Sequence, residues 1–283
     1  MIAPTFAYAR PTSLAEALDA LGRAGADGRA LAGGQSLLPL LKMRLAAPAL
    51  VVDLSRVPDL HGITETADAV RIGALETHAA IARSEVVRRE VPLMVQTASR
   101  IADPQVRNRG TLGGSLAHAD PAADWPAAVL ALDAVVEIAG PGGTREVVAA
   151  DFFRGPFATA LEPGEILVAV RVPKTAGRRQ AYAKFPHPAS GFAVVGVATT
   201  FALEGDRARA VRIAVTGAST RPFRARETES LLEGQALSEA AVREAAQHAA
   251  TGMEMVGDVY ASAEWRRHLV AVMTARAVLA ARG

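Results

Sequence analysis

Two short stretches of the same pattern decide how this chain folds: Ala32-Gly33-Gly34-Gln35-Ser36 and Thr111-Leu112-Gly113-Gly114-Ser115. Each contains adjacent glycines, which lack a Cβ, can adopt positive φ and let a ligand approach the main chain closely. Successive backbone N–H groups in such a turn can point at one anion. With the hydroxyls of Ser36, Thr111 and Ser115 as further donors, we expect the two stretches to hold the two phosphates of a dinucleotide. The alternative is that both glycine pairs only form tight turns.

The common phosphate-binding motifs are absent from the sequence. No Gly-x-Gly-x-x-Gly follows an expected strand, and there is no Gly-Lys-Ser/Thr of the Walker type. Between Asp103 and Asp124, glycines and prolines recur and no helical or strand period persists. A polar loop of this length inside a compact domain is usually functional. A nucleotide bound here would therefore sit in a different fold, with this segment as a functional loop.

The rest of the chain mixes strands and helices. We expect strands at 30–32, 50–54, 63–66, 70–72, 135–138, 144–148, 166–172, 181–185, 192–203 and 210–216. We expect helices from the Ser13 capping box, from Leu37, within 84–101, and at 125–132, 224–232, 238–249 and 262–281. The segment Thr175-Ala176-Gly177-Arg178-Arg179 is the best candidate for a linker. This order of elements predicts two α+β domains.

Composition excludes several classes of function. The chain has 283 residues, a net charge of +2, 5% aromatic residues and no cysteine. Without a basic stripe we expect no nucleic-acid partner. Without cysteine there are no disulfides, no thiolate catalysis and no Cys-ligated zinc or iron–sulphur cluster. The N-terminus lacks the pattern of a signal peptide, and no apolar run is long enough for a transmembrane segment, so we expect a cytoplasmic protein.

Other groupings of polar residues do not form a recognisable catalytic or metal site. His118, Asp120 and Asp124 have a spacing that fits no standard ligand motif, so we predict no metal. Ser36 and Ser115 lie in no Gly-x-Ser-x-Gly elbow, which argues against a serine hydrolase. We identify no general acid or base and therefore predict no catalytic residue on this chain.

Four stretches carry a resemblance to a known family. They are Ala32 to Pro39, Pro104 to Asp124, Arg71-Ile72-Gly73-Ala74 and Ser190-Gly191-Phe192-Ala193. The first two resemble the FAD-binding loops in the flavoprotein subunits of carbon monoxide dehydrogenase, xanthine dehydrogenase and related molybdenum hydroxylases. The likeness extends over nearly the whole chain, and the second stretch is long enough to be specific.

The resemblance implies a particular α+β fold. It predicts an FAD-binding domain of the vanillyl-alcohol-oxidase/PCMH type at residues 1–176, with subdomains of about 1–56 and 57–176. A C-terminal flavoprotein domain would follow at 177–283, built from a three-stranded antiparallel sheet and a helix bundle.

The resemblance also implies which residues bind FAD. Asp124 matches an acid that accepts from the adenosine ribose hydroxyls, although by itself it reads as a helix N-cap. Lys184 matches a lysine near the flavin ring, although it also reads as an exposed strand lysine. Leu167, Ile101 and Val106 match apolar residues that line the cofactor cleft in the family, although each could equally be an ordinary core residue. The predicted cofactor-binding residues are Ala32, Gly33, Gly34, Gln35, Ser36, Ile101, Val106, Gly110, Thr111, Gly113, Gly114, Ser115, Asp124, Leu167 and Lys184.

The implied activity is electron transfer through FAD. In this family a large subunit holds the molybdenum cofactor and a small subunit holds 2Fe-2S clusters, so we expect both partners here, in a dimer of heterotrimers. The lack of cysteine argues against relatives that carry a 4Fe-4S cluster in the flavin subunit. Two alternatives remain open: a free-standing FAD-dependent oxidoreductase with its own substrate, and a nucleotide-binding regulatory subunit without redox function.

Overall fold

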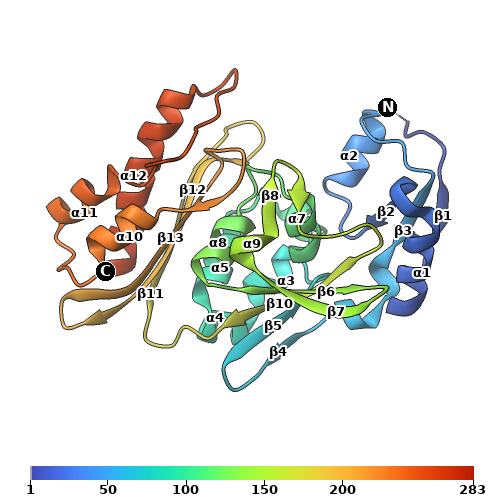
Figure 1. The fold of residues 1–283 in the computed structure, drawn as a ribbon, viewed down its shortest axis with the longest axis horizontal. Coiled ribbons are helices and arrows are strands. Elements are labelled where there is room, and N and C mark those ends of the chain that lie inside the picture. The colour runs from blue at the N-terminus through green and yellow to red at the C-terminus, as the bar shows by residue number, and fades with distance from the viewer. Residues whose placement is uncertain (1) are drawn as a thin grey trace.

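The computed structural model describes residues 2–283 and consists of three successive parts, each built on its own sheet (Figure 1). The first part carries a three-stranded sheet, the middle part a five-stranded sheet and the last part a four-stranded sheet. No helix in residues 2–283 is long and apolar enough to cross a membrane. The mixture of helix and strand confirms the predicted α+β class.

The first part is a small parallel sheet covered by one amphipathic helix. Its strands are β1 (Ala7–Ala9), β3 (Leu50–Asp53) and β2 (Gly28–Leu31), in that spatial order. Helix α1 (Leu14–Ala24) begins at the predicted cap, where Ser13 Oγ accepts from Glu16 N–H. The helix places Ala17 and Leu21 against Val52 in one core. Strand β1 was not predicted, because three half-exposed residues give no strand period.

The middle part is an antiparallel sheet in the order β4-β5-β10-β6-β7. These strands are β4 (Ile63–Glu65), β5 (Ala69–Gly73), β10 (Ile166–Pro173), β6 (Val135–Gly140) and β7 (Gly143–Val148). The central strand β10 is buried along most of its length, which explains its continuous apolar run. Two short strands, β8 (Phe153–Gly155) and β9 (Ala158–Thr159), pair separately.

Helices occupy much of the chain between β5 and β6. They are α3 (His78–Arg83), α4 (Glu85–Glu90), α5 (Pro92–Arg100), α6 (Pro104–Arg107), α7 (Leu112–His118) and α8 (Trp125–Ala131), and α9 (Ala149–Phe152) follows β7. The prediction that 103–124 is a loop without regular structure was wrong, because α6 and α7 lie inside it. Helix propensity does not predict α7, because glycine at positions 113 and 114 disfavours a helix. Its N-terminus is instead specified by Thr111, whose Oγ1 accepts from Gly114 N–H at 3.1 Å.

The last part is an antiparallel sheet in the order β11-β12-β13-β14, with three helices. The elements are β11 (Arg179–Pro186), β12 (Ala193–Glu204), β13 (Arg207–Thr216), β14 (Phe223–Arg224), α10 (Arg226–Leu232), α11 (Glu239–Ala246) and α12 (Ala263–Arg282). The predicted three strands and three helices are confirmed, and the two-residue β14 adds a short fourth strand.

The last sheet packs on both of its faces, and this fixes its position relative to the middle part. One face carries α12 and the other contacts α5 and α8. Side chains alternate along β11, so Ala181 belongs to the core under α12 while Tyr182 belongs to the core of the middle part. Lys184 shares the face of Tyr182 by the same period of two. The sequence of β11 therefore directs both polar side chains toward the N-terminus of α8.

Candidate functional site

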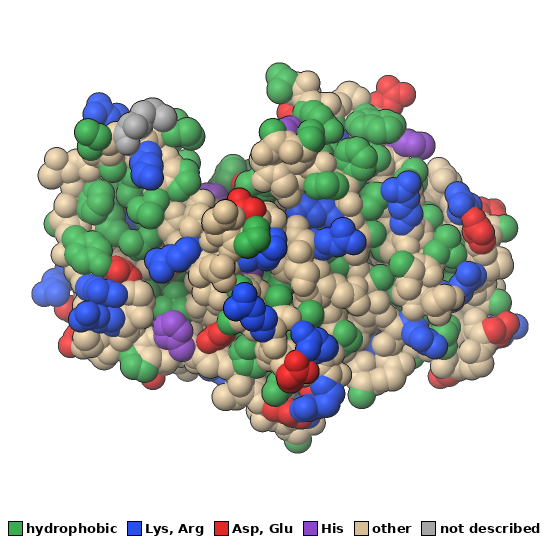
Figure 2. Space-filling view, turned by 180° about the vertical axis from the view of Figure 1, so that it is seen from behind, with side chains coloured by type: hydrophobic (Ala, Val, Ile, Leu, Met, Phe, Trp, Pro, Cys, Tyr) green, Lys and Arg blue, Asp and Glu red, His purple; other side chains and the backbone are tan. Residues whose placement is uncertain are grey.

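A cleft of about 500 Å³ runs between the first part and the rest of the molecule. From behind, the space-filling view shows a notch in the outline between the N-terminal lobe and its neighbours (Figure 2). The lining includes fourteen of the predicted residues: Ala32, Gly33, Gly34, Gln35, Ser36, Ile101, Val106, Gly110, Thr111, Gly113, Gly114, Ser115, Asp124 and Leu167. The fold thus brings together stretches that are about eighty residues apart in the chain. Lys184 is outside the lining but contacts Asp124.

The first glycine stretch offers a row of free main-chain donors. Helix α2 (Leu37–Lys42) starts where predicted, and Gly34 before it has φ +74°. Within the described residues 2–283, none of the five consecutive amides from Gly33 to Leu37 donates to a protein acceptor. All five residues line the cleft. Consecutive free N–H groups on such a turn suit an anion with several oxygens.

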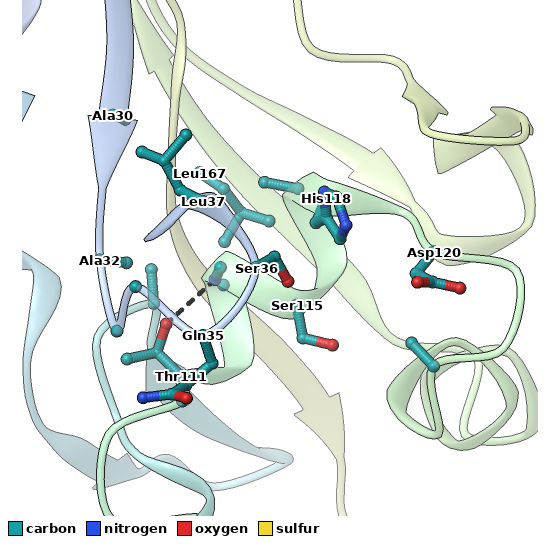
Figure 3. Close-up of a pocket in the computed structure, with 18 of the residues that line it drawn as sticks. Ala30, Ala32, Gln35, Ser36, Leu37, Thr111, Ser115, His118, Asp120 and Leu167 are labelled. Carbon is teal, nitrogen blue, oxygen red and sulfur yellow. Dashed lines mark hydrogen bonds between the residues drawn. The ribbon is translucent and has the colours of Figure 1, made fainter. Parts of the chain in front are cut away.

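The second glycine stretch works differently from the prediction. The N–H of Leu112 donates to Glu76 O at 3.0 Å, and that of Gly113 donates to Ala74 O at 2.8 Å. With the Gly114 N–H bound to Thr111 Oγ1, the first turn of α7 has no free amide left for a ligand. The expectation that both stretches present successive free amides is therefore wrong for the second, in which only the Thr111 N–H lacks an acceptor within residues 2–283. It contributes the side-chain hydroxyls of Thr111 and Ser115 instead, and Figure 3 shows Ser115 in the same cleft as Ser36 of the first stretch.

Three of the four glycines serve close packing rather than positive φ. A Cβ on Gly33 would lie 2.0 Å from Arg109 O, and a Cβ on Gly113 would lie 2.5 Å from Ala74 Cβ. A Cβ on Gly114 would lie 2.8 Å from Thr111 Oγ1 and 3.4 Å from the side chain of Ala32. Only Gly34 has the positive φ that was expected of these pairs. Gly33 and Gly114 allow the first stretch and residues 109–114 to lie in close contact, and Gly113 allows α7 to pack against Ala74.

Asp124 lines the cleft and belongs to a buried polar cluster. Its Oδ1 accepts from the Tyr182 hydroxyl at 2.5 Å, and its Oδ2 accepts from Lys184 Nζ at 2.8 Å. Lys184 Nζ also donates to Arg100 O at 3.0 Å, and its side chain is 3% exposed. Burial raises the pKa of the Asp124 carboxyl, which the Lys184 ammonium partly offsets, and burial raises the pKa of Tyr182 well above its usual value.

This cluster changes two sequence-based interpretations. Asp124 stands at the N-cap position of α8 but its side chain makes no capping hydrogen bond. Lys184 is not the exposed strand lysine of the alternative interpretation, because it is buried against Asp124. A carboxylate has more acceptor sites than these two donors use, so Asp124 can still accept from a ligand in the cleft.

Several lining residues were missed from the sequence. His78 is 4% exposed and its Nδ1 accepts from Trp125 Nε1–H at 3.0 Å. Burial, followed by the charge of Arg107, lowers the pKa of His78 to about 4. His78 lies four residues after Arg71-Ile72-Gly73-Ala74, the nearest stretch that carries the family resemblance, and no motif marks it. Phe157, with an exposed ring that contacts His118, also lines the cleft without any motif to mark it.

The cleft fits an anionic dinucleotide with a flat ring system. The free amides and the hydroxyls of Ser36 and Ser115 suit a diphosphate, and Ile101, Val106 and Leu167 offer apolar wall. A Cβ at Gly33 would push the two stretches that form this site apart, so the geometry of the site requires glycine at this position. The fold and the cleft define a dinucleotide-binding protein without a Rossmann motif.

Comparisons with known proteins agree with this class. Residues 4–175 match the family model described as FAD binding domain in molybdopterin dehydrogenase, and residues 180–281 match the CO dehydrogenase flavoprotein C-terminal domain. The chain is 39% identical to the nicotine 6-hydroxylase medium subunit of Paenarthrobacter nicotinovorans, covering 98% of both chains. It is also 39% identical to the carbon monoxide dehydrogenase medium chain of Hydrogenophaga pseudoflava, covering 99% of this chain and 98% of the other.

Solved structures agree as well. A carbon monoxide dehydrogenase structure from Hydrogenophaga pseudoflava superposes with a TM-score of 0.97 at 40% identity, covering 99% of this chain and 98% of that one. The chain therefore belongs to the family of FAD-binding flavoprotein subunits of molybdenum hydroxylases. It is an oxidoreductase subunit, and FAD is its cofactor.

Proposed function

We propose that this chain holds FAD in the cleft and relays electrons between a 2Fe-2S subunit and an external acceptor. Its partners would be a large molybdenum-cofactor subunit and a small 2Fe-2S subunit, in a cytoplasmic dimer of heterotrimers. The names of the relatives, medium subunit and medium chain, support a place between a larger and a smaller partner. Bound FAD would supply redox chemistry in both one-electron and two-electron steps.

The observation that carries the proposal is the row of free amides from Gly33 to Leu37, all of which line the cleft. These amides would bind the FAD diphosphate from one side, with the hydroxyls of Thr111 and Ser115 on the other. Gly114 would allow the second stretch to lie close to Ala32 of the first, while Gly110 and Gly113 would allow close packing against His78 and Ala74. Hydrogen bonds to a charged group are stronger than neutral ones, so several of them together give tight binding.

The polar cluster of Asp124, Tyr182 and Lys184 would hold one part of the cofactor. Asp124 would accept from the adenosine ribose hydroxyls, and Lys184, whose Nζ lies 2.8 Å from its Oδ2, would hold that carboxylate in place instead of acting at the flavin ring. Tyr182 supports this arrangement with its short hydrogen bond to the same carboxylate. Because β11 supplies both donors, the last part of the chain contributes directly to the cofactor site.

We also propose the domain division 1–176 and 177–283, with subdomains of about 1–56 and 57–176. The turn at Thr175 to Arg178 lies between β10 and β11 and supports it. The boundary between the two family matches, which end at 175 and begin at 180, supports the same position.

The proposed complex can be tested by purifying the protein through a tag on this chain. Native mass spectrometry should find two further chains in equal number, and the sample should contain flavin, iron and molybdenum. The total mass should correspond to two copies of each chain. A yellow protein that purifies alone and turns over a substrate of its own would instead identify a free-standing oxidoreductase. The relatives act on different substrates at equal identity, so the substrate is expected to follow the large subunit.

A further inference from the structure

His78 packs against Gly110, the residue that precedes the second glycine stretch. It is the first residue of α3, after the cap at which Thr77 Oγ1 accepts from Ala80 N–H at 3.1 Å. The backbone N–H of His78 donates to Gly110 O at 3.0 Å, so main chain and side chain both lie against Gly110. The imidazole is buried and lines the cleft.

The hydrogen bond with Trp125 decides which ring nitrogen carries the proton. An indole N–H can only donate, and Trp125 Nε1 donates to His78 Nδ1 at 3.0 Å. Nδ1 is therefore unprotonated and the neutral ring carries its proton on Nε2. Burial and the nearby charge of Arg107 hold the pKa of His78 at about 4, so the ring stays neutral near pH 7. His78 consequently presents one defined donor, Nε2–H.

That donor has no acceptor within residues 2–283. Within the described residues, the side-chain polar atoms that are both fully buried and without a hydrogen-bond partner are Thr199 Oγ1, Arg266 Nε and Thr274 Oγ1. His78 Nε2 is not one of these atoms, although it has no partner. Nε2 therefore remains open to the cleft. A Cβ on Gly110 would lie 2.7 Å from Nε2, so glycine at 110 keeps the approach to this donor clear.

We propose that His78 contacts the cofactor directly, donating from Nε2–H to an oxygen of the FAD diphosphate or the adjoining ribityl chain. Trp125 acts as a positioning residue that fixes the ring and its tautomer. This inference rests on the proposed placement of FAD in the cleft. A neutral donor suits a site whose amides already face the diphosphate, because it adds a hydrogen bond that does not vary with pH near neutrality.

The test compares three variants by FAD affinity. FAD is titrated into apoprotein prepared from the purified complex, and binding is followed by quenching of flavin fluorescence. His78→Leu removes the donor and should weaken binding about ten- to hundredfold, as loss of a hydrogen bond to a charged group does. His78→Gln, which places an amide donor at a similar reach, should restore most of that loss. Trp125→Phe keeps the His78 donor and should weaken binding less than His78→Leu.

The outcomes separate this inference from the proposed function. Wild-type affinity in folded His78→Leu, or equal losses in His78→Leu and Trp125→Phe, would show that His78 has only a structural role. Normal binding in Gly33→Ala would instead overturn the cleft assignment itself. If His78→Leu does not fold, long-range ¹H–¹⁵N spectra of the wild-type histidines decide the matter. We expect the spectra to show the Nε2–H tautomer of His78. The His78 Nε2 signal should shift when FAD is added, while the signals of the exposed His61 stay unchanged. An Nδ1–H tautomer or an unshifted signal would refute the proposal.

Discussion

Replacing Gly33 by alanine should abolish tight FAD binding while leaving most of the fold intact. The new Cβ would lie 2.0 Å from Arg109 O and 2.8 Å from Gly110 Cα. Both neighbours are backbone atoms, so no side chain can rotate away. Because contacts under 3.0 Å are not tolerated, the two glycine stretches must separate by at least about 1 Å.

The structure sets the size of this effect. A displacement of about 1 Å takes an N–H···O bond of ordinary length beyond hydrogen-bond range. Each hydrogen bond to a charged group contributes about 1.5–3 kcal/mol, so losing two would cost about 3–6 kcal/mol. Such a loss corresponds to a Kd weaker by roughly 10²- to 10⁴-fold. Strain from the extra methyl would add about 1–3 kcal/mol of lost folding stability.

Equilibrium dialysis of apoprotein against FAD measures the affinity, and urea unfolding followed by circular dichroism checks the fold. Gly22→Ala is the control for the same substitution, because Gly22 lies in α1 and a Cβ there meets nothing within 4 Å. That variant should bind FAD normally and unfold at the same or a slightly higher urea concentration. A folded Gly33→Ala protein with a Kd within about threefold of wild type would refute the reasoning.

Three further predictions follow from the same site. Gly114→Val should also abolish flavin content, because its side chain would displace the Thr111 cap and press on Ala32; unchanged flavin absorbance in the folded variant would contradict this. Lys184→Met should lower the free energy of unfolding by about 3–5 kcal/mol, since it leaves the Asp124 carboxylate buried and unpaired. Adding Asp124→Asn should recover part of the loss in urea titrations, and strictly additive losses would argue against coupling. His78 has a folded pKa of about 4, below the ordinary 6.5, so its stabilising contribution is present above pH 6.5 and is lost as the pH falls toward 4. Between pH 7 and pH 5 the wild type should therefore lose about 2 kcal/mol more stability than His78→Gln, and equal losses would show that the ring protonates freely.

Much of the architecture was predictable because it is encoded locally. The Ser13 cap, the start of α2 at Leu37 and the hairpin of β12 and β13 all follow from caps, periods and turn residues that act within a few positions. The helix at 112–118 was not predictable in this way. Its two glycines disfavour a helix, and it exists because the Thr111 cap and close packing on Ala74 outweigh propensity.

Some features of the candidate site were likewise predictable from the sequence, and others were not. Fourteen of the fifteen residues predicted to bind the cofactor line one cleft in the structure. The role of each glycine stretch was not predictable, because it depends on which backbone amides already donate hydrogen bonds within the protein. The carbonyls of Ala74 and Glu76 satisfy the amides of the second stretch, and no local pattern announces a partner about forty residues away.

By itself, the sequence determined the kinds of group available: two glycine pairs without a Cβ, hydroxyls beside them and no cysteine. It also determined, through the period of β11, that Tyr182 and Lys184 share one face. Only the tertiary structure decided that the first stretch keeps its amides free, that Gly33 touches Arg109 and that His78 faces the cleft with Nε2–H. The physical reason is that hydrogen-bond satisfaction and steric contact are properties of pairs of atoms. For this site, most of the partners are brought together only by folding.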